Sequence, residues 1–196
     1  MLTLRKIAVT GGIASGKTAV CHILKTHGAR VLLSDKIVHR LLEEDPECIK
    51  RVVQLLGEAV LTDGKIDRNK VAAIVFSDKE KLRDLENILH PKLFAVIDQE
   101  YEKEKKEKTA SCFVVEMPLV QEIGKAKDFD TIVFVDCSEE TAKSRLKEEL
   151  SYDQRMARQW TRKKKIKHAD YVLENSGTME TLKQNTLELL KEICSQ

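Results

Sequence analysis

The sequence predicts an α/β fold: a doubly wound parallel sheet of about five strands with helices on both faces. Short β-branched apolar runs alternate along the 196 residues with longer stretches whose apolar residues recur every three or four positions. This pattern is typical of strands alternating with amphipathic helices. The first apolar run also leads into a glycine-containing segment, 11–18, and a stretch without glycine or proline follows it. In such a sheet, ligands bind at the carboxyl ends of the strands.

The strands and helices can be placed in order along the chain. A helix is expected after the glycine-containing segment, with Gly28 as its C-cap, and two helical stretches precede the last strand. An amphipathic helix is expected from Thr178 to the C-terminus. The five strands are expected at 6–10, 29–33, 112–116, 131–135 and 171–173.

Residues 36–108 form a long insertion after the second strand and contain little strand signal. Apolar residues at helical spacing predict several helices there, separated at Asp45-Pro46, Asp63-Gly64 and His90-Pro91. A chain of this length is expected to form one domain with a sizeable core. The central part of this domain, apart from the insertion and the segment 145–168, would comprise about 1–35, 109–144 and 169–196.

Composition and charge argue against several classes of partner. The 34 lysines and arginines nearly balance 32 acidic residues, so the net charge of +2 gives no general attraction to nucleic acid or membranes. We find no signal peptide and no apolar run long enough to cross a bilayer. The five cysteines are scattered without a C-x-x-C pair, which favours reduced thiols over disulfides or a zinc site. We expect a cytoplasmic protein that binds neither nucleic acid nor membranes, and its oligomeric state stays open.

The segment 11–18 carries the phosphate-binding pattern G-x-x-x-x-G-K-[ST]. Its backbone N–H groups and the positive end of the next helix would face a phosphate chain. Lys17 would reach the β- and γ-phosphates, and the Thr18 hydroxyl would ligate Mg²⁺. The strand before and the helix after it argue against an ordinary glycine-rich turn. The sequence therefore predicts a nucleoside triphosphate site formed by Gly11, Gly12, Ile13, Ala14, Ser15, Gly16, Lys17, Thr18 and Ala19.

Two acidic residues stand at the ends of predicted strands, on the same edge of the sheet as the phosphate loop. Asp35 follows the second strand, where phosphoryl transfer needs a group that orients or deprotonates an attacking hydroxyl. Asp35 or Ser34 would equally suit the N-cap of a helix beginning near Lys36. Glu116 ends the third strand and would hold Mg²⁺, directly or through water, unless it is only a salt-bridged strand-end acid.

The phosphate loop and further motifs resemble those of dephospho-coenzyme A kinases, in the same order along nearly the whole chain. Thr10-Gly11-Gly12-Ile13 is similar to the family's lead-in to the loop, and Asp35 matches the second acid of its Asp-Ala-Asp motif. Many families share the phosphate loop, so the other motifs are more specific. They are Asp63-Gly64-Lys65-Ile66-Asp67-Arg68 with Phe76, Leu89-His90-Pro91, Glu116-Met117-Pro118-Leu119 with Glu122, Gln159-Trp160-Thr161-Arg162, and Ala169-Asp170 with Glu174-Asn175-Ser176-Gly177.

The resemblance implies ATP-dependent phosphorylation of the ribose 3′-hydroxyl of dephospho-coenzyme A, the last step of coenzyme A synthesis. Asp35 would be the general base or the orienting group, and Lys17 would stabilise charge on the transferring phosphoryl group. Thr18 with Glu116 would position Mg²⁺, so catalysis would rest on alignment and electrostatics. The alternatives are another small-molecule kinase, for a nucleoside or a sugar, and a nucleotide-dependent regulatory protein.

The resemblance also implies a role for each part of the chain. Residues of about 36–108 would bind the acceptor, and about 145–168 would form a helical lid in which Arg162, with Arg158, closes on the nucleotide phosphates. A solvated basic helix face is the alternative for this segment. Asn175 would lie against the adenine, unless it only begins a strand-to-helix turn. The acceptor pocket would be shaped by Arg68, His90, Pro91 and Pro118.

Two of these residues keep structural alternatives, and a few positions depart from the family pattern. A pair with Asp67 or a role at a helix end is as plausible for Arg68 as acceptor binding, whereas a structural role in capping or packing is favoured for His90. Leu33, Ala14 and Glu116 stand where the family has Asp, Gly and Asp. Arg145 aligns with a family arginine, but the Arg-Asp usually found after it is absent from Lys147-Glu148-Glu149-Leu150.

Overall fold

The computed structural model describes residues 4–145 and 159–195. The chain forms two compact units. The first contains the described residues up to Leu33 and from Tyr101 onwards, and the second is Ser34–Glu100. Helix α5 (Lys79–Glu107) contributes residues to both units. None of the helices in the described ranges is long and apolar enough to cross a membrane.

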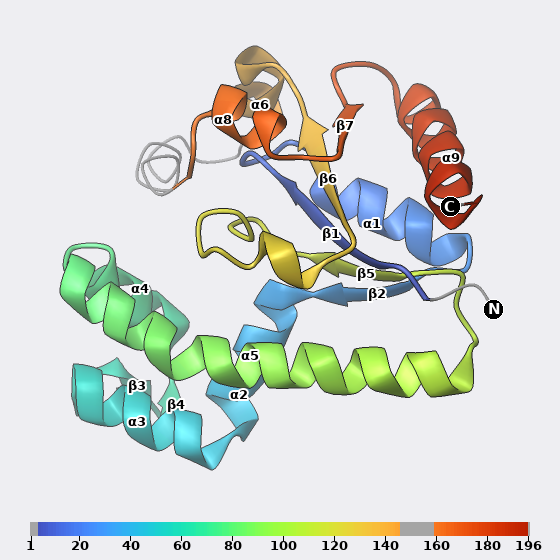
Figure 1. The fold of residues 1–196 in the computed structure, drawn as a ribbon. Coiled ribbons are helices and arrows are strands. Elements are labelled where there is room, and N and C mark those ends of the chain that lie inside the picture. Colours follow the sequence, from blue (N-terminus) through green and yellow to red (C-terminus); the bar gives the residue numbers. More distant parts are fainter. Residues whose placement is uncertain (1–3, 146–158, 196) are drawn as a thin grey trace. The chain divides into compact units, whose positions relative to one another are not determined.

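The first unit is built on a five-stranded parallel sheet with the strand order β2-β5-β1-β6-β7 (Figure 1). The central strand, β1, is buried along its whole length, as expected for a strand covered on both faces. All five predicted strands are confirmed to within one residue at each end. They are β1 (Lys6–Gly11), β2 (Arg30–Leu33), β5 (Phe113–Glu116), β6 (Thr131–Asp136) and β7 (Tyr171–Glu174).

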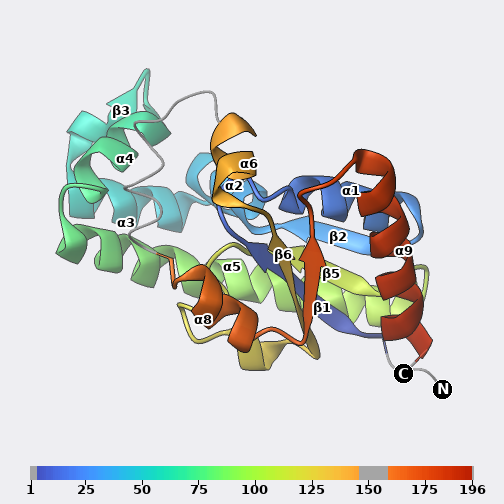
Figure 2. The same ribbon diagram turned by 90° about the horizontal axis from the view of Figure 1, so that it is seen from above.

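Helices cover both faces of this sheet, which confirms the predicted fold class. On one face, α1 and α9 pack Val20, Leu24 and Leu182 against the sheet in the main core cluster. Figure 2 shows α9 beside β7, at the edge of the sheet. On the other face, the ring of Tyr101 in α5 packs edge-on against Phe113, with 5.3 Å between the ring centroids. The helices of the first unit are α1 (Lys17–Thr26), α6 (Glu139–Arg145), α8 (Arg162–Lys167) and α9 (Met179–Ser195), with a 3-10 turn at Ala126–Asp128.

The second unit is mainly helical. The predicted break at Asp45-Pro46 is confirmed, because the Asp45 carboxylate accepts a hydrogen bond from the Cys48 N–H at 2.9 Å and caps the next helix. Pro46 stands at the first helical position, where its missing N–H costs nothing. The elements of this unit are α2 (Ser34–Glu44), α3 (Pro46–Leu56), a 3-10 turn at Glu58–Val60, β3 (Leu61–Thr62), β4 (Lys65–Ile66), α4 (Arg68–Val75) and the first part of α5.

The predicted break at Asp63-Gly64 is confirmed as a β-hairpin turn between two strands of two residues each, in an insertion that otherwise has little strand, as expected. β3 and β4 pair antiparallel, with Thr62 opposite Lys65. Asp63 and Gly64 both have positive φ, +50° and +76°, as a two-residue hairpin turn requires. The Asp-Gly dipeptide was therefore a hairpin signal, and two-residue strands are too short to show a periodic pattern.

The predicted break at His90-Pro91 is wrong, because α5 runs through both residues. Proline removes one backbone N–H and tends to kink or end a helix. Here apolar side chains continue at helical spacing on both sides of it, and Leu85, Leu89 and Leu93 are all buried. We attribute the continuous helix to this burial, which outweighs one missing backbone hydrogen bond.

Glu104 closes the C-terminal end of α5, and this contact predicts a pH-dependent stability. Its Oε1 atom accepts hydrogen bonds from the Thr109 hydroxyl at 2.7 Å and from the N–H groups of Thr109 at 2.8 Å and Ala110 at 2.7 Å. The Thr109 hydroxyl, with these N–H groups, lowers the pKa of Glu104. Glu104→Gln is expected to lower the free energy of unfolding by about 2 kcal/mol at pH 7.

The direction of this pH dependence follows from the lowered pKa of Glu104. A carboxyl whose pKa is lower in the folded state stabilises the protein above its unfolded pKa, and that stability is lost as the pH falls through the folded pKa. The difference between wild type and Glu104→Gln should therefore shrink below about pH 4. Urea unfolding at several pH values measures it, with the exposed Glu102→Gln as the matched control. A difference independent of pH would contradict the prediction.

Candidate nucleotide-binding site

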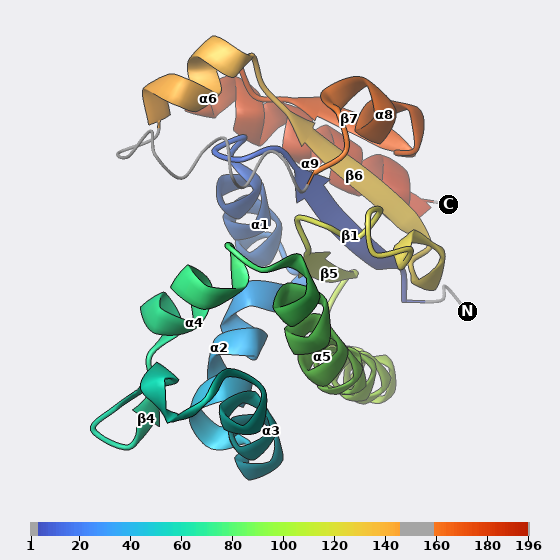
Figure 3. The same ribbon diagram turned by 90° about the vertical axis from the view of Figure 1, so that its left-hand side faces the viewer.

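The phosphate loop joins the end of β1 to the start of α1 (Figure 3). A Cβ atom on Gly11 would overlap the carbonyl oxygen of Val135 in β6. Gly16 is the N-cap of α1 with a φ of +95°, and a Cβ atom there would overlap the side-chain amide of Asn175. Only glycine fits these two close approaches. The loop backbone therefore packs directly against β6 and the segment after β7.

Lys17 lies along its own loop. Its ammonium donates hydrogen bonds to the carbonyl oxygens of Gly12 at 2.7 Å and Gly11 at 3.2 Å. The residue is buried, so its charge is held at the loop and is only weakly screened by water. A phosphate chain bound to the loop would meet this ammonium. Its contact with the β- and γ-phosphates stays a prediction.

The middle of the loop contains two residues with special features. Ala14 has a φ of +54°, a left-handed conformation that costs a non-glycine residue about 1 kcal/mol. This is the position at which the family has glycine, so the structure explains that preference. The hydroxyl of Ser15 is buried and has no hydrogen-bond partner among the described residues. A buried donor of this kind is available to an anion bound at the loop.

Asn175 supports the loop from the end of β7. Its side-chain amide donates a hydrogen bond to the Ser15 carbonyl at 2.8 Å, and its own N–H donates to the Asp136 carbonyl at 2.7 Å. Its carbonyl accepts from the Arg145 guanidinium at 3.1 Å. The side chain is therefore committed to the loop. Asn175 also leads from β7 towards α9, as the strand-to-helix alternative expects, and its contact with adenine stays a prediction.

Thr18 and Glu116 meet at the carboxyl ends of β1 and β5. The Thr18 hydroxyl lies 3.2 Å from Glu116 Oε1 and 3.3 Å from Oε2. A hydroxyl and a carboxylate are hard oxygen donors of the kind that Mg²⁺ prefers, and Mg²⁺ usually keeps several waters besides them. These two residues therefore fit the predicted magnesium site. The described residues contain no cluster of three or more His, Cys, Asp or Glu side chains that could hold a metal.

The thiol of Cys21 lies near this pair but is inert. Burial raises its pKa, and the Glu116 carboxylate raises it further, so the thiol stays protonated. All five cysteines are free thiols, in agreement with their scattered positions in the sequence.

A cavity of about 120 Å³ opens beside the phosphate loop and is lined in part by Gly12 and Ser15. Arg162, the first residue of α8, also lines it. The Arg162 guanidinium makes a bidentate ion pair with Asp136 at the end of β6, with Nε 2.6 Å from Oδ1. The Arg162 side chain is nevertheless 64% exposed. The structure thus brings Arg162 to the loop, and its contact with nucleotide phosphates stays a prediction.

Pro118 lies in the turn that follows β5, in the first unit. Its carbonyl accepts hydrogen bonds from the Thr10 hydroxyl at 2.9 Å and the Lys165 ammonium at 2.6 Å. The other three residues predicted to shape the acceptor pocket, Arg68, His90 and Pro91, belong to the second unit. Arg158 lies outside the described residues, as does much of the predicted lid.

Asp35 lies in the first turn of α2, which begins at Ser34 directly after β2. The helix expected near Lys36 is confirmed and begins two residues earlier, because no loop separates β2 from α2. Asp35 is therefore inside the helix, where its carboxylate interacts favourably with the helix dipole, and the N-cap alternative does not hold. Leu33, two residues earlier, pairs with Glu116 in β5.

His39 stands one turn after Asp35 on α2 and is half-buried. Burial lowers its pKa below the usual 6.5, the nearby Arg68 charge lowers it further, and Asp35 acts in the opposite direction. His39 is therefore neutral at pH 7. Within the second unit, the charges of Arg68, Asp35, Lys36 and Glu43 all act on His39.

Arg68 and His90 lie in different helices of the second unit, α4 and α5. Arg68 is the exposed first residue of α4, and the Asp67 carboxylate caps that helix by accepting from the Asn69 N–H at 2.9 Å. His90 lies inside α5, where its ring packs edge-on against Phe94 with 6.2 Å between the centroids. Packing rather than capping is therefore the structural role of His90. Pro91 follows it in the same helix.

The sequence reasoning missed Asp136 and His39. Asp136 ends β6, one residue beyond the predicted strand, and the rule that singled out Glu116 at a strand end would have found it. His39 was signalled by its spacing of four residues from Asp35. Arg145 was noted, but its contact with Asn175 joins residues 30 positions apart. No local pattern predicts such a contact.

A parallel sheet whose central strand leads through a G-x-x-x-x-G-K-T loop into a helix defines a P-loop nucleotide-binding protein. Comparison with known proteins gives the family. The family model described as dephospho-CoA kinase matches residues 5–181. The chain is 41% identical over 199 residues to the dephospho-CoA kinase of Protochlamydia amoebophila, with 98% of each chain covered.

Solved structures agree with this match. The chain resembles TT1252 from Thermus thermophilus with a TM-score of 0.80 and 32% identity, covering 97% of this chain and 98% of that one. It resembles the dephospho-CoA kinase from Campylobacter jejuni with a TM-score of 0.63 and 25% identity, covering 98% of each. The chain belongs to the dephospho-CoA kinase family. It is a kinase, with ATP as co-substrate and a small molecule as acceptor.

Proposed function

We propose that this chain transfers the γ-phosphoryl group of ATP to the ribose 3′-hydroxyl of dephospho-coenzyme A, giving coenzyme A and ADP. The observation that carries the proposal is the phosphate loop with the Lys17 ammonium held on it, in a chain that matches the family over residues 5–181. In the transfer, the hydroxyl oxygen forms a bond to the γ-phosphorus while the bond to the β,γ-bridging oxygen breaks. The hydroxyl proton passes to a base or to solvent.

The residues at the loop would bind and align the triphosphate. Backbone N–H groups of the loop and the first turn of α1 would hold the phosphates, and Lys17 would neutralise charge as it spreads over the γ-phosphoryl oxygens. The buried Ser15 hydroxyl would donate to a phosphate oxygen. Arg162 would turn from Asp136 to the phosphates, since its side chain is 64% exposed. Residues of about 145–168 would close over the nucleotide as a lid.

Thr18 and Glu116 would hold Mg²⁺. The ion would neutralise phosphate charge and fix the orientation of the phosphate chain. Their side chains already meet at hydrogen-bond distance, which supports a shared role. The substitution of Glu116 for the family's Asp moves the carboxylate by one methylene, and Glu116 would hold the ion directly or through water.

The second unit would bind dephospho-coenzyme A. Asp35 would accept or orient the 3′-hydroxyl, and the exposed guanidinium of Arg68 would pair with acceptor phosphate. Both residues belong to the second unit, and both lie near enough to His39 to affect its pKa. His90 and Pro91 would contribute to the shape of the acceptor pocket on this unit. The cytoplasmic location expected from the cysteines stays a prediction.

A direct assay tests the proposal. Purified chain is incubated with ATP, Mg²⁺ and dephospho-coenzyme A, and the products are separated and identified by mass spectrometry and phosphorus NMR. We expect ADP and a product phosphorylated at the ribose 3′-oxygen, and neither without Mg²⁺. Parallel reactions offer nucleosides and simple sugars as acceptors. Preferential phosphorylation of one of these, with dephospho-coenzyme A unchanged, would overturn the acceptor assignment.

A further inference from the structure

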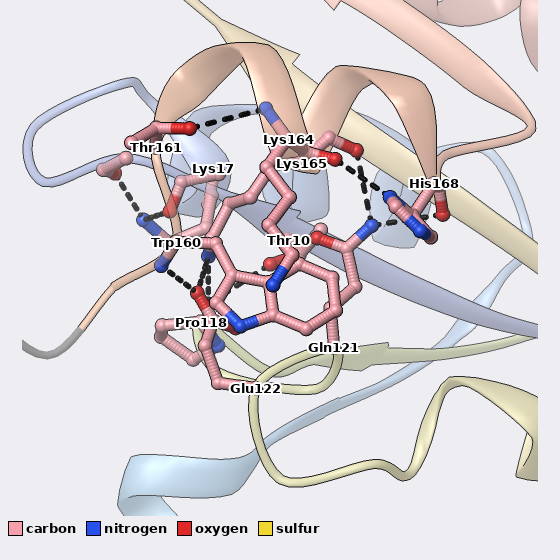
Figure 4. Close-up of polar contacts among 12 residues, drawn as sticks. Thr10, Lys17, Pro118, Gln121, Glu122, Trp160, Thr161, Lys164, Lys165 and His168 are labelled. Carbon is pink, nitrogen blue, oxygen red and sulfur yellow. Dashed lines mark hydrogen bonds and ion pairs between the residues drawn. The ribbon is translucent and has the colours of Figure 1, made fainter.

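Helix α8 contains a buried lysine that has no role in the proposed function and lines the cavity beside the phosphate loop. Lys165 is 1% exposed. Its ammonium donates to the Pro118 carbonyl at 2.6 Å and lies 3.0 Å from Glu122 Oε1 (Figure 4). Burial lowers the pKa of Lys165, and Glu122 acts in the opposite direction. A buried ammonium is costly unless it is paired, so this side chain depends on Glu122.

The same turn holds both ends of the segment that contains α8. Glu122 Oε1 also accepts a hydrogen bond from the Trp160 N–H at 2.8 Å, ahead of the helix. Gln121 donates from its side-chain amide to the carbonyls of Lys165 at 3.1 Å and His168 at 2.8 Å, at the end of the helix. Figure 4 shows these contacts converging on the turn after β5. The segment 160–168 is therefore anchored by side chains, over a sequence separation of about 40 residues.

The segment 160–168 is connected to the phosphate loop in two ways. The Pro118 carbonyl that binds Lys165 also accepts from the Thr10 hydroxyl at 2.9 Å, and Thr10 directly precedes Gly11. On α8, Arg162 precedes Lys165 by three residues, so the two lie on neighbouring turns. Arg162 and Lys165 both line the cavity beside the loop. The position of Arg162 is thus linked to the end of β1 through Lys165 and Pro118.

Stability alone does not explain a buried pair here. Replacing a buried ion pair by well-packed apolar residues is often neutral or stabilising, whereas removing one partner is strongly destabilising. A charged pair fixes orientation, because its atoms must meet within hydrogen-bond distance. An apolar contact has no such requirement, so the two elements it joins are held in a less uniquely defined orientation.

We propose that Glu122 and Lys165 are positioning residues, whose ion pair holds the segment 160–168 against the turn after β5 and so positions Arg162 for the nucleotide phosphates. The inference rests on the proposed function only for the role of Arg162. It predicts that loss of the pair weakens ATP binding, even when the fold remains stable.

Trp160 is the only tryptophan of the chain and lies within the anchored segment, so its fluorescence reports on the anchor. Its ring lies 3.6 Å from the Lys164 ammonium, and its centroid is 5.2 Å from that of His168. Detachment of the segment would expose the half-buried indole to water. The emission maximum and acrylamide quenching of the full chain measure this directly, without any substrate.

The experiment compares wild type with Glu122→Gln, Lys165→Met and a control, Lys163→Met, at an exposed neighbour on α8. Each protein is titrated with ATP and Mg²⁺ while Trp160 emission is recorded, and thermal unfolding is measured in parallel. The first two variants should show red-shifted emission, stronger quenching and a Kd for ATP raised about tenfold, as expected when one charge-assisted hydrogen bond to phosphate is lost. The control should match wild type. Unchanged emission and Kd in folded single variants would overturn the inference.

A double variant covers the case in which the single variants fail to fold. Glu122→Leu with Lys165→Met replaces the pair by apolar side chains, and its thermal stability should return to near that of wild type. Its Kd for ATP should remain raised. Recovery of wild-type ATP affinity would show that the pair is only structural. A wild type that binds ATP but forms no coenzyme A would overturn the proposed function and leave this inference standing, because the titrations contain no acceptor.

Discussion

Replacement of Lys17 by alanine is expected to lower kcat/KM by about a thousandfold or more, the effect of removing a principal charge from a phosphoryl-transfer site. The Lys17 ammonium is buried at the loop and bonded to the Gly11 and Gly12 carbonyls. Alanine leaves no positive charge at this position to neutralise the transferring phosphoryl group. Coupled assays at saturating dephospho-coenzyme A, with ATP varied, measure the loss.

The structure also indicates how to separate catalysis from folding in this variant. Lys17 bonds to its own loop, so its removal leaves two carbonyls without a donor and lowers stability as well. Lys17→Met retains the apolar stem of the side chain and isolates the charge. Lys25→Ala removes an exposed lysine from the last turn of the same helix and is the matched control. Activity of Lys17→Met within tenfold of wild type, in a folded protein, would rule out the proposed role.

The parts of the site that local sequence determines could be predicted well. The loop from Gly11 to Thr18 is contiguous, and its glycines are needed at the two close approaches that the structure shows at Gly11 and Gly16. The contact of Thr18 with Glu116 could be expected from one general rule: the carboxyl ends of neighbouring parallel strands share an edge of the sheet. The five strands were clear because buried parallel strands are short, apolar and β-branched.

The parts that depend on distant contacts could not be predicted. The Asn175 side chain bonds to Ser15 over 160 positions, and Arg162 pairs with Asp136 over 26. No local sequence pattern indicates that residues so far apart along the chain are in contact. Pro91 suggested a break by its local chemistry, but burial of the leucines around it keeps α5 continuous. In the sequence Lys165 is one member of a basic run, and only the fold shows that it is buried while Lys163, Lys164 and Lys167 are exposed.

Asp35→Asn is expected to lower kcat by about a hundredfold or more, since general-base or orienting groups contribute about 10²–10⁴ to proton transfer. Asp35 occupies the first turn of α2, two residues beyond the strand residue that pairs with Glu116. The neighbouring His39 is held neutral by burial and by Arg68. The lowered pKa of His39 disfavours an ion pair between His39 and the Asp35 carboxylate at pH 7.

Three substitutions at Asp35 distinguish the roles that the residue could have. Asparagine keeps an oxygen that accepts a hydrogen bond but cannot take a proton, whereas alanine removes both functions. If Asp35 orients the 3′-hydroxyl, Asp35→Asn should retain much more activity than Asp35→Ala; if it is the base, both should lose activity alike. The Kd for ATP should be unchanged in both, because phosphate binding resides on the loop. Asp35→Glu restores the carboxylate at a longer reach and should recover part of kcat. Full activity in Asp35→Ala would show that Asp35 takes no part in the transfer, because alanine can neither accept a proton nor accept a hydrogen bond.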